Sequence, residues 1–297
     1  MTNNIKQAII IGGGPAGVSA ALYLARAGQK VCIIENGPGA LAKAHKIDNY
    51  YGIAASGAKL YAAGLEQARS LGVEILQDEV LGVEYTDCFT LSLKNTDEQL
   101  QTEALVLATG SKNITLNLPG LIELEGKGIS YCAVCDGFFF RKKRVAVLGN
   151  GAYALHEAAY LKQLAGSVTI LTNGQSGDAA KAAGFEVNTS VLQAVEGSGK
   201  LSSIRFTDGS TLAVDGLFIA LGTADSTDMA RKLGAELNGR FIRIDGDGAT
   251  NIPGLFAAGD CTGGLMQVAK AVHEGARAGL TALKFLRQRQ SDAAMSK

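Results

Sequence analysis

Two cysteines separated by two residues, Cys132 and Cys135, are the side chains with the clearest chemistry in this chain. Such a pair can close a small disulfide ring at the start of a helix, where the helix dipole favours a thiolate. A thiolate attacks a partner disulfide through a mixed disulfide. The carboxyl group of Asp136 follows directly and can move protons beside the pair. The spacing therefore predicts a redox-active dithiol, with two buried structural cysteines as the alternative.

The remaining cysteines, Cys32, Cys88 and Cys261, have no partner at a useful spacing. Five cysteines scattered along a chain of this length do not form a disulfide framework. One Cys-x-x-Cys without a second Cys/His pair does not form a zinc site. We therefore predict no metal, and we expect Cys32 to lie in a buried strand.

A glycine-rich turn near the start of the chain predicts a dinucleotide site. It consists of the candidate cofactor-binding residues Gly12, Gly13, Gly14, Pro15, Ala16 and Gly17. The turn follows an apolar run at 8–11 and opens a helical pattern at 16–27, and the next apolar run ends at Glu35. In such a βαβ unit the glycines allow the tight turn, the approach of a pyrophosphate to the helix N-terminus and close helix–strand packing. Glu35 would accept hydrogen bonds from ribose hydroxyls; the alternative is a glycine turn without a ligand.

A second glycine turn at 149–151 follows a strand pattern at 145–148 and opens a helical pattern at 152–165. An ungapped alignment of the two units places Thr172 opposite Glu35, so the acid that would bind the ribose of NAD is missing. No basic pair for the 2′-phosphate of NADP follows this strand either. The sequence predicts a retained nucleotide-binding fold that lacks its nucleotide discriminator.

Apolar strand patterns alternate with helical patterns along the chain, which predicts an α/β fold with two Rossmann-like units. A strand pattern at 254–258 and a long helix at 267–289 follow the second unit. The simplest arrangement inserts the second unit in the first. We expect the boundaries 1–114, 115–245 and 246–297, with the first and last segments forming one domain.

The composition excludes several kinds of partner. Lys and Arg number 28 and Asp and Glu number 28, so no bulk charge indicates nucleic acid or a membrane surface. No apolar run approaches the roughly 20 residues of a spanning helix. The polar start followed by a short strand is not a signal peptide. We expect a cytoplasmic protein that binds neither nucleic acid nor membrane.

Charged residues outside these motifs have two interpretations each. The basic run at 141–144 can steer an acidic protein partner, or it is a solvated turn before a strand. His273 and Glu274 on the C-terminal helix can reach a cofactor, or they are solvated. His156 is expected at the surface of the second helix.

Taken together, these residues resemble the low-molecular-weight thioredoxin reductases, a family of flavoenzymes, over nearly the whole chain. The motifs that carry the resemblance are IIIGGGPAG near the start, LVLATGS at 105–111, GISYCAVCDGFFF at 128–140, VAVLGNGAYA at 145–154 and NIPGLFAAGDCTGG at 251–264. The resemblance implies two Rossmann-like FAD/NAD(P)-binding domains, the second inserted in the first. It also implies FAD as cofactor, thioredoxin or a thioredoxin-like protein as partner, and a homodimer.

The resemblance further implies which residues hold FAD in the domain built from both chain ends. The first glycine turn would hold the pyrophosphate and Glu35 the adenosine ribose. Asn49 would lie near the flavin and Asp260 would bind the ribityl chain. The remaining candidate contacts are Gln267 and Val268, which would touch the ring system, and Gly110 and Gly259.

For the dithiol domain, the resemblance implies that Cys135 faces the flavin and that Cys132 attacks the thioredoxin disulfide. Asp136 would be the acid/base. A rotation of the small domain would show the dithiol alternately to flavin and to thioredoxin.

Three departures from the NADPH-linked members set this chain apart. Their His-Arg-Arg segment is replaced by Leu-Thr-Asn-Gly at 171–174, their Arg-Gln pair by Met266-Gln267, and their Gly-Gly-Gln-Leu loop by Gly-Ala-Leu-Ala at 39–42. These losses resemble the ferredoxin-dependent flavin thioredoxin reductases, which predicts reduced ferredoxin as electron donor. The intact second glycine turn leaves NADH, or a second nucleotide such as a flavin, as alternatives. A further alternative is a flavin-binding redox sensor without turnover.

Overall fold

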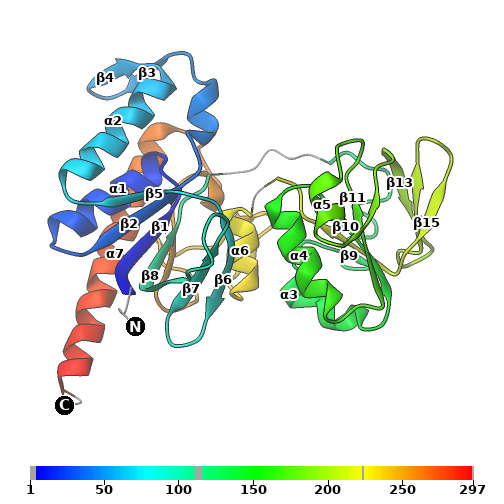
Figure 1. The fold of residues 1–297 in the computed structure, drawn as a ribbon. Coiled ribbons are helices and arrows are strands. Elements are labelled where there is room, and N and C mark those ends of the chain that lie inside the picture. Colours follow the sequence, from blue (N-terminus) through cyan, green and yellow to red (C-terminus); the bar gives the residue numbers. More distant parts are fainter. Residues whose placement is uncertain (1–4, 111–115, 223, 296–297) are drawn as a thin grey trace. The chain divides into compact units, whose positions relative to one another are not determined.

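The computed structural model describes residues 5–110, 116–222 and 224–295 and shows an α/β fold, which confirms the predicted class (Figure 1). The chain divides into two compact units. One consists of residues 1–112 and 225–297, and the other consists of residues 113–224. The second unit is therefore an insertion in the first.

The far boundary of the inserted unit differs from the expected position after residue 245, because residues 225–245 belong to the first unit. In this stretch the buried hydroxyl of Ser226 accepts a hydrogen bond from the backbone N–H of Thr109 at 3.0 Å. The Thr109 hydroxyl in turn accepts a bond from the Ser226 N–H at 2.9 Å. These partners are 117 positions apart, so no local sequence pattern marks the boundary.

The sheet of the first unit has seven strands in the order β5-β2-β1-β8-β7-β6, with β19 beside β8. The pairs around β1, β2, β5, β8 and β19 are parallel, whereas β6 and β7 add an antiparallel edge. Every residue of β2 is buried, as expected of an apolar strand covered on both faces. The bounds are β1 Ile5–Ile11, β2 Val31–Glu35, β5 Glu74–Gln77, β6 Val80–Tyr85, β7 Phe89–Leu93, β8 Leu100–Leu107 and β19 Leu255–Ala257.

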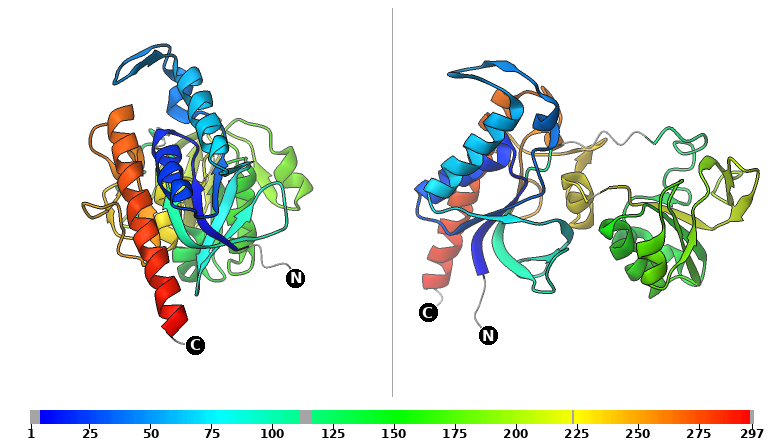
Figure 2. Two further views of the ribbon diagram at one scale, coloured as in Figure 1. Left: turned by 90° about the vertical axis from the view of Figure 1, so that its left-hand side faces the viewer. Right: turned by 45° about the horizontal axis from the view of Figure 1, so that its top comes forward.

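Helices α1 (Pro15–Arg26) and α7 (Val268–Met295) lie side by side and pack through small residues (Figure 2). A Cβ atom on Gly275 would lie 2.1 Å from the backbone oxygen of Ala16. One on Gly279 would lie 2.7 Å from the backbone oxygen of Ala20. Only hydrogen fits at these distances, so the glycines determine how closely the helices approach.

The second unit contains a parallel five-stranded sheet in the order β12-β11-β10-β16-β9 and a three-stranded antiparallel sheet, β13-β14-β15. The dithiol segment forms the short helix α3 (Ala133–Asp136), which packs against α4 (Ala152–Lys162) and continues into the 3₁₀ turn η2 (Gly137–Phe140). The strands are β9 Ile129–Ser130, β10 Arg144–Leu148, β11 Ser167–Leu171, β12 Glu186–Asn188, β13 Leu192–Glu196, β14 Ser203–Phe206, β15 Thr211–Ala213 and β16 Gly216–Ile219.

The smaller elements complete the two units. They are η1 Gly39–Lys43, β3 Ile47–Tyr50, β4 Ile53–Ala55, α2 Gly57–Ser70, α5 Asp178–Ala182, α6 Ser226–Lys232, β17 Leu237–Asn238, β18 Phe241–Ile242 and η3 Asp260–Thr262. Within the described ranges, no helix combines the length and apolar character that crossing a bilayer requires.

Candidate active site

The first glycine turn connects β1 to α1, and its glycines have different surroundings. Gly12 has a φ of 116°, and a Cβ atom there would lie 2.3 Å from the backbone oxygen of Ala108. A Cβ atom on Gly17 would lie 1.9 Å from the oxygen of Gly12, whereas one on Gly14 would meet no atom within 4 Å. The turn therefore packs tightly at Gly12 and Gly17 and is open at Gly14.

The N-terminus of α1 faces this open side without a side-chain cap. Gly14 is the N-cap residue and makes no side-chain hydrogen bond to the helix, and Pro15 follows. The backbone N–H groups of a first helical turn have no partner inside the helix, and with the helix dipole they attract an anion. This geometry suits a pyrophosphate.

Glu35 stands at the end of β2 and is almost fully buried. Its Oε2 atom accepts a hydrogen bond from the Gly37 N–H at 2.7 Å and another from the hydroxyl of Tyr61 on α2. Burial, followed by this bond to Glu35, raises the pKa of the Tyr61 hydroxyl, so the hydroxyl stays protonated and donates. The sequence gives no signal for Tyr61 beyond its place in an amphipathic helix.

Two candidate flavin contacts that are far apart in the sequence meet in the structure. The Nδ2 atom of Asn49 on β3 donates a hydrogen bond to Oε1 of Gln267 at 2.9 Å, although 218 positions separate the two residues. Gln267 directly precedes α7, which begins at Val268. Both amide side chains are therefore held in one place within the first unit.

The loop at 259–264 approaches the first glycine turn. Gly259 has a φ of 88°, and a Cβ atom there would lie 2.9 Å from the Cβ of Ala16. Asp260 follows it at the start of η3. Burial raises the pKa of the Asp260 carboxyl against the opposing charge of Lys270. Gly110, with a φ of 77°, lies after β8 in the same unit.

Lys270 and Glu274, one turn apart on α7, hold this loop from within. The Nζ atom of Lys270 donates to the backbone oxygens of Gly259 at 2.8 Å and Gly263 at 2.6 Å, and it forms an ion pair with Glu274 at 2.9 Å. Glu274 accepts bonds from the Gly259 N–H at 2.9 Å and the Thr262 hydroxyl at 2.8 Å. The sequence interpretation missed Lys270 and left Glu274 open; a lysine and a glutamate four residues apart on a helix that follows a glycine loop were the available signal.

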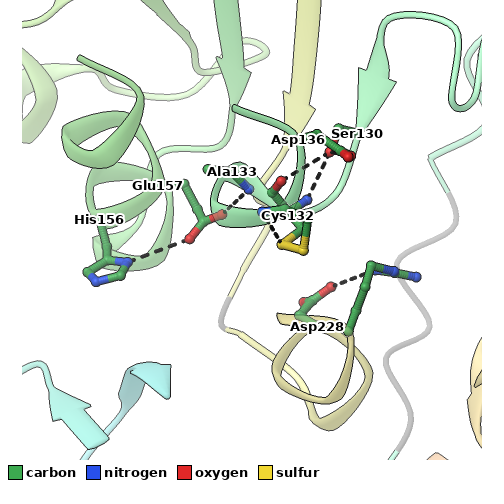
Figure 3. Close-up of a disulfide and its surroundings, with 9 residues drawn as sticks. Ser130, Cys132, Ala133, Asp136, His156, Glu157 and Asp228 are labelled. Atoms are coloured by element: carbon green, nitrogen blue, oxygen red, sulfur yellow. Dashed lines mark hydrogen bonds and ion pairs between the residues drawn. A yellow bond between two sulfur atoms is a disulfide. The ribbon is translucent and has the colours of Figure 1, made fainter. Parts of the chain in front are cut away.

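The disulfide between Cys132 and Cys135 is closed, with the two Cα atoms 5.3 Å apart (Figure 3). Cys132 is buried and is the N-cap of α3, where its Sγ atom accepts a hydrogen bond from the Cys135 N–H at 3.1 Å. Cys135 is exposed. The pair thus stands at a helix start, which is the position that favours a thiolate.

Asp136 is connected to the dithiol through Ser130, which the sequence interpretation did not select. The Ser130 hydroxyl donates to the Asp136 carboxylate at 2.6 Å and accepts from the Cys132 N–H at 3.1 Å (Figure 3). Ser130 therefore connects the Asp136 side chain to the backbone of Cys132.

The second glycine turn keeps its backbone geometry. Gly149 has a φ of 152°, and a Cβ atom there would lie 2.2 Å from the oxygen of Ala220. The loop after β11 folds onto this turn, because Nδ2 of Asn150 donates to Oε1 of Gln175 at 2.6 Å. The buried Thr172 hydroxyl donates to the backbone oxygen of Gln175 at 2.6 Å. Neutral side chains thus take the positions where a nucleotide discriminator is expected.

The surroundings of the other cysteines and of the basic run do not indicate catalytic roles. Burial raises the pKa of both the Cys32 and the Cys261 thiols to about 12, so neither forms a thiolate at neutral pH. Cys88 is partly exposed. Arg144, the last residue of the basic run, is bonded to Asp215 at 3.2 Å. Among the described residues, no three His, Cys, Asp or Glu side chains form a group that could hold a metal.

The candidate residues thus form two groups, one in each unit. The glycine turn, Glu35, Asn49, Gly110, Gly259, Asp260, Gln267 and Val268 belong to the first unit, and Cys132, Cys135 and Asp136 belong to the second. The first group has the features of a dinucleotide site, and the second has those of a thiol–disulfide exchange site. A protein with both is a disulfide oxidoreductase built on nucleotide-binding folds.

Comparison with known proteins agrees with this class. A family model for the pyridine nucleotide-disulphide oxidoreductases matches residues 6–275, so the chain belongs to that family. The chain is 33% identical over 312 residues to a thioredoxin reductase of Peptoclostridium litorale, which covers 96% of this chain and 98% of that protein.

Two solved structures are also similar. The atypical thioredoxin reductase TRi from Desulfovibrio vulgaris Hildenborough has a TM-score of 0.90 and 39% identity over 95% of this chain and 98% of its own. A ferredoxin-flavin thioredoxin reductase from Clostridium acetobutylicum has a TM-score of 0.71 and 28% identity over 96% of this chain and 99% of its own. The chain is a flavin disulfide oxidoreductase of the thioredoxin reductase type, and its cofactor is FAD. The open, uncapped turn at Gly14 and the buried Glu35 fit that dinucleotide.

Replacing Lys270 by methionine is expected to weaken FAD binding about tenfold, or about 1.4 kcal/mol. The loop at 259–264 would lose the donor that joins three of its oxygens. Equilibrium dialysis of FAD against the apoprotein measures the change. Lys284→Met, which removes an exposed lysine from the same helix, is the matched control and should keep wild-type affinity. Equal affinity in both variants would show that the Lys270 contacts do not support the cofactor.

Proposed function

We propose that this enzyme reduces thioredoxin or a thioredoxin-like protein with electrons from a donor other than NADPH, reduced ferredoxin being the first candidate. The supporting observation is the loop after β11. Its Gln175 accepts a hydrogen bond from Asn150 of the second glycine turn, and residues 172–177 include no Lys or Arg for a 2′-phosphate. Bound FAD accepts electrons singly and passes on a pair, which suits a one-electron donor. The first unit would bind FAD and the second would carry the dithiol.

Within the first unit, the N-terminus of α1 would hold the FAD pyrophosphate at Gly14, where the backbone is open. Glu35, already bonded to Tyr61, would accept the adenosine ribose hydroxyls. Asp260 would bind the ribityl chain, and the Asn49–Gln267 pair would lie near the flavin. These residues bind and orient the cofactor.

In the second unit, the thiolate of Cys132 would attack the partner disulfide, so that a mixed disulfide forms and one partner thiolate leaves. The Cys135 thiolate would then attack Cys132 Sγ, which closes the Cys132–Cys135 disulfide and releases the second partner thiolate. Asp136, held by Ser130, would supply protons to the leaving sulfurs. Because Cys132 is buried while the disulfide is closed, its attack requires a rearrangement that uncovers its sulfur.

The surface beside the dithiol has features that suit contact with a protein partner. Phe138 and Phe139 directly follow the cysteine turn and are 65% and 68% exposed. Their rings meet edge to face with centroids 6.4 Å apart, and the Arg141 guanidinium carbon lies 5.8 Å from the centroid of the Phe138 ring. Exposed aromatic residues with arginine are typical of protein interfaces. We propose that this patch contacts the thioredoxin-like substrate.

The donor is tested by stopped-flow reduction of the bound FAD. We expect reduced ferredoxin to bleach the flavin, and to support partner reduction, at least about 100-fold faster than NADPH or NADH; a factor of 100 corresponds to about 2.7 kcal/mol. An NADPH-linked thioredoxin reductase in the same apparatus is the positive control. Rapid bleaching by micromolar NADPH or NADH would overturn the ferredoxin proposal and favour a reductase with unusual nucleotide contacts.

We also propose that the second unit can bind a second nucleotide, such as a flavin, because the backbone of its glycine turn is intact. Absorbance of the purified holoprotein gives the number of flavins per chain. One flavin per chain would indicate that the second unit is only a scaffold for the dithiol. Two flavins per chain would indicate that the second unit binds a flavin as well. A homodimer is also proposed, on the resemblance to the family, and light scattering coupled to size exclusion tests it.

A further inference from the structure

A buried carboxylate contacts the start of the dithiol helix. Glu157 on α4 is 2% exposed, and its Oε2 atom accepts a hydrogen bond from the Ala133 N–H at 2.9 Å. Its Oε1 atom lies 3.6 Å from Nδ1 of His156. Figure 3 shows the Glu157 side chain between His156 and Ala133, the residue that follows Cys132. His156, which was expected at the surface, is partly buried, and its ring lies beside this buried acid.

This carboxylate and the hydroxyl of Ser130 occupy two backbone amides beside the Cys132 sulfur. Cys132 is the N-cap of α3, and the amides of the first turn are those that stabilise a thiolate there. Glu157 takes the Ala133 N–H, and Ser130 takes the Cys132 N–H at 3.1 Å. A thiolate at Cys132 would keep the Cys135 N–H that its Sγ atom already accepts. It would, however, have the Glu157 carboxylate as a like charge nearby, in an interior where charges interact more strongly than in water.

We propose that Glu157 is a positioning residue that fixes α3 and keeps the Cys132–Cys135 pair strongly reducing by disfavouring the thiolate form of Cys132. The proposal rests on the proposed dithiol chemistry. Reduction of the disulfide takes up two electrons and two protons, and any extra stabilisation of a thiolate would stabilise the reduced form. A dithiol whose reduced form is stabilised is the poorer reductant. Glu157 acts in the opposite direction and favours electron delivery to the partner.

The charged and titratable groups around Glu157 come from two helices. His156 on α4 lies beside the carboxylate, and Tyr153 and Tyr160 lie one turn to either side on that helix. Asp136 on α3 adds a second carboxylate, held through Ser130. Strand β11 carries no ionisable side chain, and Arg144 of β10 is bonded to Asp215.

Glu157→Gln is the decisive variant, because the amide oxygen can still accept the Ala133 N–H while the charge is gone. The intact holoenzyme is equilibrated in buffers of reduced and oxidised dithiothreitol, and the Cys132 and Cys135 thiols are trapped by alkylation and counted by mass spectrometry. The equilibrium is measured at a pH above the wild-type alkylation midpoint of Cys132, where the reduced form carries the thiolate. The expected result there is a shift of about tenfold toward the reduced pair, or about 30 mV for a two-electron couple. The pH midpoint for alkylation of Cys132 should fall by about one unit.

Glu186→Gln removes another carboxylate of the same unit, one that accepts only the Thr169 hydroxyl among the bonds described, and should leave both values unchanged. A wild-type equilibrium in Glu157→Gln would overturn the proposal and leave Glu157 a purely structural role. If that variant does not fold, Glu157→Met, which removes the charge but keeps a side chain of similar length, should shift the equilibrium in the same direction; no shift would count equally against the proposal. Dithiothreitol replaces the physiological donor, so failure of the ferredoxin proposal leaves this test valid. A wild-type disulfide that dithiothreitol never reduces would overturn the dithiol chemistry itself.

Discussion

Cys135→Ser is expected to lower turnover with a thioredoxin-like substrate by at least about 1,000-fold and to accumulate a mixed disulfide on Cys132. The thiol that attacks the partner remains, but the thiol that resolves the mixed disulfide is gone. Non-reducing electrophoresis and mass spectrometry of the adduct measure this outcome. Turnover that survives in Cys135→Ser would count against an enzymatic role for the pair.

Cys132→Ser is the matched variant, and it should lose turnover to the same extent without forming the adduct. The comparison is informative because Cys135 is the exposed sulfur and Cys132 the buried one in the closed disulfide. An adduct that forms through Cys135 instead would reverse the assignment of the two thiols. Cys88→Ser should keep full activity, since Cys88 is a free cysteine for which we propose no role.

The second large effect concerns the first glycine turn, where two alanine substitutions should fail for different reasons. In Gly17→Ala the new Cβ would lie 1.9 Å from the oxygen of Gly12, so the turn must open. We expect the free energy of unfolding of the apoprotein to fall by about 2–3 kcal/mol, as for overpacking, with loss of bound FAD. In Gly14→Ala the Cβ meets no protein atom within 4 Å, so the apoprotein should keep its stability.

Gly14→Ala should nevertheless weaken FAD binding at least tenfold, because the methyl group enters the space assigned to the pyrophosphate. Denaturant unfolding of the apoprotein and FAD dialysis separate the two effects. Gly64→Ala on α2 is the control: its Cβ would contact Val18 at 3.5 Å, an ordinary distance, and FAD affinity should not change. Wild-type FAD affinity in Gly14→Ala would place the pyrophosphate elsewhere.

Much of the fold and site could be predicted because the signals are local. The strand, glycine turn and helix around Gly12 are contiguous, and so are the cysteine turn and Asp136. The α/β class was correct for the same reason, since buried parallel strands are apolar runs that can be recognised one by one.

The boundary near residue 245 was wrong because its evidence is not local. Ser226 belongs to the first unit through bonds to Thr109, and a serine at the start of a short helix has no feature that predicts its bonding partner. The same holds for Tyr61 on Glu35 and for Lys270 on the loop at 259–264. Each is an ordinary residue of an amphipathic helix until the helix is packed.

The sequence by itself determined the class of chemistry. It showed a dithiol between two glycine turns and showed that the second turn lacks a nucleotide discriminator, because those features depend on residue type and short spacing. Only the tertiary structure brought Asn49 to Gln267, Ser130 to Asp136 and a buried Glu157 to the start of the cysteine helix. Hydrogen bonds between different elements depend on how those elements pack, and no spacing along the chain encodes them.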